Sequence, residues 1–171
     1  MSNSYYIIII LRMLTYMQRL TWLEIVFGVI PENLIFIFGI YVFSNTIICR
    51  KKLLLSALLV SLSTYLVKLL PLQFGIHMFI FIMVFIAISA FMNHIDIIKA
   101  VTSVLLLFII RLITEWISIF ALEKLSNISV ETLADNPLEK VLYALPSLFI
   151  FFMVVLIVYI LKHNKQKKRI D

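Results

Sequence analysis

The run FIFIMVFIAISAF at residues 79–91 and the run FIFFMVVLIVYIL at residues 149–161 decide the fold class of this chain. Neither run contains a charged residue. A membrane β-barrel would alternate apolar and polar residues in short segments, whereas these runs are continuously apolar. In hydrocarbon, every backbone N–H and C=O must be satisfied within the protein, and a helix achieves this within one segment. We therefore predict an all-α fold, a polytopic helical bundle in a cell membrane.

The composition supports the lipid bilayer as the main partner. Of 171 residues, 63% are hydrophobic and 14% are charged, whereas soluble domains have about 45–50% apolar and about 25% charged residues. A soluble fold of this length would expose much of that apolar surface to water. The chain has no phosphate-binding loop, no HExxH and no paired catalytic acids. We therefore expect no catalytic residues, no cofactor, no metal and no nucleic-acid partner.

The length of the apolar segments predicts the number of spans. A spanning helix needs about 20 mostly apolar residues, and Pro31 fits the first turn of such a helix because its missing N–H costs nothing there. We predict five spans, at residues 31–49, 53–70, 74–92, 96–122 and 141–161. The predicted organisation is an N-terminal apolar or amphipathic segment at 1–30, the bundle at 31–162 and a basic cytoplasmic tail at 163–171.

The N-terminal segment has two interpretations. Arg12, Thr15, Arg19 and Trp22 share one helical face, which is typical of an amphipathic helix lying in the membrane interface. The alternative is a sixth span, which would move the N-terminus from the extracytoplasmic side to the cytoplasmic side. We favour the interfacial helix.

The distribution of the formal charge of +6 predicts the orientation. Basic residues near a span resist translocation and accumulate in the cytoplasm. The loop after the first span and the C-terminal tail are basic, whereas the loop at residues 123–140 has more acids than bases. We therefore predict a cytoplasmic C-terminus. Basic residues on that side are expected to contact anionic lipid: Arg50, Lys51, Lys52, Lys165, Lys167, Lys168 and Arg169.

Arg111 and Glu115 form the most informative polar pair. They lie near the middle of the fourth predicted span, four residues apart and so on one face. A lone charge at that depth costs about 2.5–3.5 kcal/mol, and an opposite charge offsets part of that cost. Thr114 and Ser118 extend the stripe, so we predict a polar intramembrane core from these four residues. It could be a functional site or a structural ion pair.

A second group of polar residues falls near the predicted external surface. Glu32, Lys68 and His77 each stand close to the external end of a span, and together they could line an external cavity. Each also has a simpler interpretation. Lys68 can extend to the headgroups, Glu32 can complement the helix dipole, and His77 can be solvated.

Several short motifs are similar to those of one signalling family. The stretch LLPLQFGIH at 69–77 resembles the membrane-embedded sensor region of clostridial histidine kinases with a GHKL-type catalytic part, as in peptide quorum sensing. The dipeptide PE at 31–32, DNPL at 135–138 and LP at 145–146 look similar too. The resemblance implies a sensor-like module over residues 31–161. Because the chain ends at Asp171, we expect no kinase domain.

Three functions follow as hypotheses. The first is a non-enzymatic sensor-like or accessory module in signalling, which pairs with a kinase, a transporter subunit or a second copy of itself. The second is a small permease or the substrate-binding subunit of a transporter. The third is a membrane cysteine peptidase that uses Cys49 with His94. In the membrane endopeptidases of peptide quorum systems the histidine precedes the cysteine, and here Cys49 precedes His77 and His94, which disfavours the third.

Overall fold

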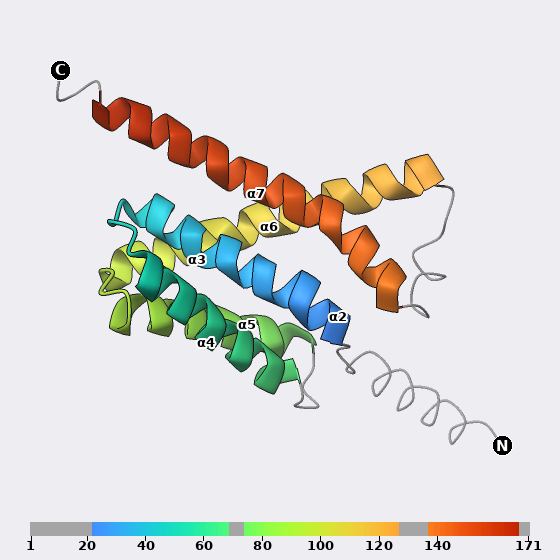
Figure 1. Ribbon diagram of the computed structural model, residues 1–171, viewed down its shortest axis with the longest axis horizontal. Helices are drawn as coiled ribbons and strands as arrows, with labels where there is room; N and C mark the ends of the chain where they lie inside the picture. The colour runs from blue at the N-terminus through green and yellow to red at the C-terminus, as the bar shows by residue number, and fades with distance from the viewer. Residues whose placement is uncertain (1–21, 69–73, 127–136, 168–171) are drawn as a thin grey trace.

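The computed structural model describes residues 22–68, 74–126 and 137–167, and these residues form helices and no strand (Figure 1). The elements are α2 (Trp22–Glu24), the π-helix η1 (Ile25–Val29), α3 (Ile30–Ser44), α4 (Arg50–Lys68), α5 (Phe74–Phe91), α6 (Ile97–Ser126) and α7 (Pro137–Lys167). The all-α prediction is confirmed. Most of the predicted interfacial helix, the segment 127–136, Lys168 and Arg169 lie outside the described residues.

Helix α3 is the centre of the bundle. It packs against α4, α6 and α7 and more lightly against α5, while α4 packs against α5, α5 against α6 and α6 against α7. Figure 1 shows α3 between the α4–α5 pair and the α6–α7 pair. The ring of Phe36 on α3 lies 4.8, 5.0 and 5.2 Å, centroid to centroid, from the rings of Phe85, Phe108 and Phe151. Four helices thus meet at one aromatic side chain.

The helix that contains the first predicted span begins earlier than residue 31. The backbone is already helical at Trp22, so Pro31 lies inside a continuous helix and not in its first turn. Proline has no N–H, and its ring clashes with the carbonyl four residues earlier. The helix accommodates this with the π turn of η1, in which the Ile30 N–H bonds to the Ile25 carbonyl. The expected boundary between the N-terminal segment and the bundle, at residues 30 and 31, therefore falls within one helix.

Helix α4 buries small and polar side chains and exposes leucines, which is the reverse of a surface helix in a water-soluble protein. Its buried residues are small or polar, namely Ser56, Ala57, Val60, Ser61, Thr64 and Val67. Its exposed face carries Leu54, Leu55, Leu58, Leu59, Leu62 and Leu66. On the inner face, Asn33 Nδ2 of α3 donates to Ser61 Oγ at 3.1 Å and to Thr64 Oγ1 at 3.4 Å. Small and hydroxyl side chains between helices with leucine outside are typical of packing in lipid.

Three helical segments of the described chain are long and apolar enough to cross a membrane: Ile25–Ser44, Ile97–Ala121 and Ala144–Lys162. A shorter apolar helix covers Ile76–Phe91. In the most apolar 18-residue stretch of each segment, only 28% of α6 and 22% of α7 is buried within the protein. Apolar helices that leave so much of their surface uncovered support a membrane location. The five-span topology and its orientation stay predictions.

Candidate functional site

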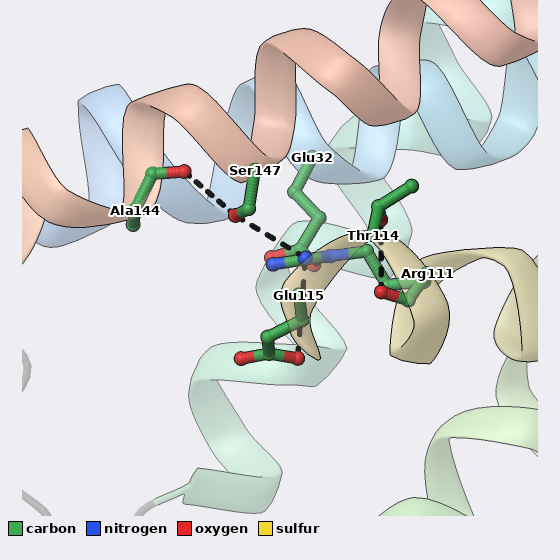
Figure 2. A network of polar contacts seen from close by, with 6 residues as sticks. All are labelled: Glu32, Arg111, Thr114, Glu115, Ala144 and Ser147. Carbon is green, nitrogen blue, oxygen red and sulfur yellow. Dashed lines mark hydrogen bonds and ion pairs between the residues drawn. The ribbon is translucent and has the colours of Figure 1, made fainter. Parts of the chain in front are cut away.

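The side chain of Arg111 is the centre of a polar cluster between helices (Figure 2). Its Nε donates to Glu32 Oε1 at 2.6 Å, which joins α6 to α3. The Arg111 side chain is 13% exposed and that of Glu32 is 32% exposed. A short contact between a guanidinium and a carboxylate is a charge-assisted hydrogen bond, about twice as strong as a neutral one. This ion pair is the tightest polar link between helices in the described part of the chain.

A third helix contributes through Ser147 of α7. Arg111 Nη1 donates to Ser147 Oγ at 3.4 Å, and Ser147 Oγ donates to the Ala144 carbonyl at 2.8 Å. Ser147 directly follows Pro146, which lies inside α7. Since a guanidinium has five N–H donors in a fixed fork, one Arg111 side chain contacts α3 and α7 at once. The cluster therefore lies where three helices meet.

Glu115 is a second, looser acidic neighbour of Arg111. Its Oε2 lies 3.9 Å from Arg111 Nη1, and its side chain is 50% exposed. The predicted pairing of Arg111 with Glu115 is thus present as the weaker of two contacts. Figure 2 shows both carboxylates near the guanidinium. One cation faces two acids, which leaves the three side chains with a net charge of −1 when both acids are ionised.

Thr114 and Ser118 lie on the predicted stripe but do not bond to the charged groups. Thr114 Oγ1 donates to the carbonyl of Arg111 at 2.9 Å, within its own helix. Ser118 Oγ is buried and has no hydrogen-bond partner in the structure. The polar core is thus built mainly from Arg111 and Glu32, with both hydroxyl groups packed beside it.

The three residues of the predicted external cavity are not brought together by polar contacts. Glu32 is held by Arg111. The ring of His77 lies 6.4 Å from that of Phe81, centroid to centroid. Within the described segments no hydrogen bond or ion pair joins Lys68 or His77 to Glu32. The packing of α3 on α6 gives Glu32 a partner in Arg111, and the external cavity stays a prediction.

A second cation, Lys162 at the C-terminal end of the predicted bundle, also contacts another helix. Lys162 Nζ of α7 donates to the carbonyls of Val42 at 3.0 Å and Phe43 at 3.2 Å, and lies 5.5 Å from the centroid of the Phe43 ring. The last carbonyls of a helix lack partners within the helix and carry its negative dipole end. Lys162 therefore caps α3 from another helix.

Most of the remaining predicted residues are exposed, and the side chain of Lys167 lies outside what the structure describes. Cys49 is free and exposed, and His94 is exposed in a turn with a positive φ of 53°. Arg50, Lys51 and Lys52 form the first turn of α4, and Lys165 is exposed near the end of α7. The described residues contain no group of three or more His, Cys, Asp or Glu side chains that could hold a metal ion.

No family model, curated protein or solved structure matches this chain. The resemblance to kinase sensor regions therefore stays a prediction.

Proposed function

We propose that this chain is a non-enzymatic, sensor-like or accessory module of membrane signalling that works with a partner membrane protein. It crosses the cell membrane five times with its C-terminus in the cytoplasm. The observation that carries the proposal is the position of Arg111, which pairs tightly with Glu32 of α3 and has Glu115 of its own helix within 3.9 Å.

Arg111 contacts two acids on different helices, Glu32 through Nε at 2.6 Å and Glu115 through Nη1 at 3.9 Å, and in this proposal the two acids exchange it. When Arg111 holds Glu32, α6 is tied to α3, and when it turns to Glu115 the charge is compensated within α6 and the tie to α3 is released. A ligand or partner shifts such an equilibrium only by its difference in affinity for the two states. A pair of alternative ion contacts supplies two such states, which is what a sensor needs.

The proposed five-span arrangement draws support from α4. This helix carries three basic residues in its first turn and exposes leucines along its length. A leucine surface belongs in hydrocarbon, and the basic turn belongs on the cytoplasmic side. When α4 crosses the membrane in this orientation, the α3–α4 turn and the end of α7 both lie on the cytoplasmic side.

Affinity purification from the membranes of the native host tests the proposal. The tagged full chain is extracted in mild detergent, and integral membrane proteins that co-purify are quantified by mass spectrometry. We expect a histidine kinase or another signalling membrane protein with the wild type. Arg111→Leu and Glu32→Gln should lower its recovery at matched levels of the bait, because both remove the tie between α3 and α6.

Lys99→Leu is the matched control, because it removes an exposed cation at the start of the same helix and should leave recovery unchanged. Recovery of the wild type alone, or with a transporter ATPase, would contradict the signalling role. The second outcome would favour a transporter subunit. Equal partner recovery with all three variants would show that the ion pair has no part in partner binding.

A further inference from the structure

The outer face of α6 carries a carboxylate in an otherwise apolar surface. Glu115 lies inside the apolar segment Ile97–Ala121, and its side chain is 50% exposed. The segment ends at Ala121, about 9 Å farther along the helix axis at 1.5 Å per residue. Lysine and arginine keep their charge in water by means of long apolar stems, and the stem of glutamate is shorter. In a membrane, the exposed side of Glu115 therefore faces hydrocarbon or another helix.

The charge of Glu115 is only loosely compensated within the protein. Its Oε2 lies 3.9 Å from Arg111 Nη1, whereas Arg111 Nε donates to Glu32 Oε1 at 2.6 Å. One guanidinium thus serves two carboxylates. A lone charge in hydrocarbon is costly, and charged side chains of membrane helices pair with one another. A cation from outside this chain would complete the pairing at Glu115.

Glu115 is one of four residues that border a hole between side chains on the helix surface. Residues three and four apart are neighbours on a helix, so the hole is bordered by Leu112, Glu115, Trp116 and Ile119, and all four are exposed. Where two helices pack as knobs into holes, one side chain inserts among four residues of the facing helix. This hole has a carboxylate on one side and the indole of Trp116, 74% exposed, on the other.

The two sides of the hole select a basic side chain. A carboxylate forms a charge-assisted hydrogen bond with a guanidinium or an ammonium group, and tryptophan is the best aromatic partner of a cation. Leu112 and Ile119 would contact the apolar stem. We propose that a transmembrane helix of another protein docks on this face of α6 and inserts an arginine or lysine into the hole. The inference rests on the partner role proposed above and names the chemistry of that partner.

Docking at this hole would also act on the contacts of Arg111. A partner cation beside Glu115 compensates that carboxylate and, as a like charge, repels Arg111 from it. Arg111 then stays with Glu32, and α6 stays tied to α3. The partner thus binds one of the two states preferentially, which is the condition for shifting their populations.

A synthetic transmembrane peptide serves as the probe. The full chain, labelled with a donor dye, is reconstituted in phosphatidylcholine vesicles with an acceptor-labelled leucine–alanine helix that carries one arginine at the depth of Glu115. A matched peptide has leucine at that position. Energy transfer measures the affinity of each peptide. We expect the arginine peptide to bind roughly fivefold more tightly, as polar contacts between helices do in model peptides.

Two substitutions of Glu115 separate its charge from its role in folding. Glu115→Gln should lower the preference for the arginine peptide to less than about twofold, whereas Glu115→Asp keeps the charge and should retain most of the preference. Trp116→Ala should weaken binding of the arginine peptide roughly threefold, because a cation–π contact is lost. Leu58→Ala is the matched control. It shortens an exposed apolar side chain of α4 and should leave the affinity unchanged.

Three results would overturn this docking surface. They are equal binding of the arginine and leucine peptides, a preference that persists in Glu115→Gln, and an effect of Trp116→Ala no larger than that of Leu58→Ala. Self-association of the chain without peptide, if Glu115→Gln abolished it, would assign the face to a second copy and contradict the proposal.

The peptide measurement fails independently of the signalling role, because it involves no native partner. A preference for the arginine peptide would support the docking surface even if no signalling protein were recovered from the host membranes. Recovery of a signalling protein together with equal binding of the two peptides would support the signalling role and overturn the surface.

Discussion

Arg111 and Lys162 lie near opposite ends of α3 and are accommodated in different ways. Arg111 contacts a carboxylate at 2.6 Å, whereas Lys162 contacts two backbone carbonyls at 3.0 and 3.2 Å. The acceptor of Arg111 neutralises its charge, and the acceptors of Lys162 do not. Arg111 joins helices through an opposite charge, whereas Lys162 joins α7 to the C-terminal end of α3 through backbone carbonyls and their dipole.

Of the substitutions near the two ends of α3, Arg111→Leu is expected to lower the free energy of unfolding most. It leaves Glu32 half-buried among apolar helices without its cation, and breaking a buried pair in this way costs about 3–5 kcal/mol. Lys162→Gln should cost less, about 1–2 kcal/mol, because a neutral amide still donates to the α3 carbonyls. Thermal unfolding in detergent measures both.

The control for that comparison is Lys99→Leu, which should leave Tm within error. If Arg111→Leu destabilises the protein no more than Lys162→Gln does, the distinction between the compensated and the uncompensated cation fails.

A smaller effect is expected at Gly39, which lies in α3 between these two contacts and faces Leu107 of α6. A Cβ at Gly39 would lie 2.6 Å from Leu107 Cδ2, and Leu107 is fully buried. Overpacking of this kind costs about 1–3 kcal/mol, and the better helix propensity of alanine offsets up to about 1 kcal/mol. Gly39→Ala should therefore lower the free energy of unfolding by about 1 kcal/mol, with the ion pair weakened as well.

Gly28→Ala is the matched control, since a Cβ there would meet nothing within 4 Å. It should be neutral or slightly stabilising. Equal stability of the two alanine variants would mean that α3 and α6 are less closely packed than the structure has them.

Local spacing was enough to predict some features of this molecule. Continuous apolar runs predicted the helices, and the isolated Arg111 in such a run predicted an intramembrane polar site. The i, i+4 rule also found Glu115 as a neighbour, because that contact depends on one helix alone. Each of these predictions uses residues within a few turns of one another.

The rest depends on how helices pack against each other. The pair Glu32–Arg111 joins residues 79 positions apart, and nothing in their separate surroundings identifies them as partners. Lys162 was predicted only as the last residue of the bundle, and its contact with the end of α3 depends on how α7 packs against α3. The inner face of α4 is marked in the sequence by the spacing of Ser56, Ser61 and Thr64, a signal that depends on one helix alone.

A pair of double-mutant cycles tests the central claim most directly: that Arg111 pairs across the bundle with Glu32 and only weakly with Glu115. The free energy of unfolding is measured for Arg111→Leu, Glu32→Gln, Glu115→Gln and the two double variants that contain Arg111→Leu. Coupling between close partners is about 0.5–3 kcal/mol, and a half-exposed pair at 3.9 Å should give less than about 0.5 kcal/mol. The account predicts strong coupling for Arg111 with Glu32 and weak coupling with Glu115. Equal coupling, or the reverse order, would contradict it.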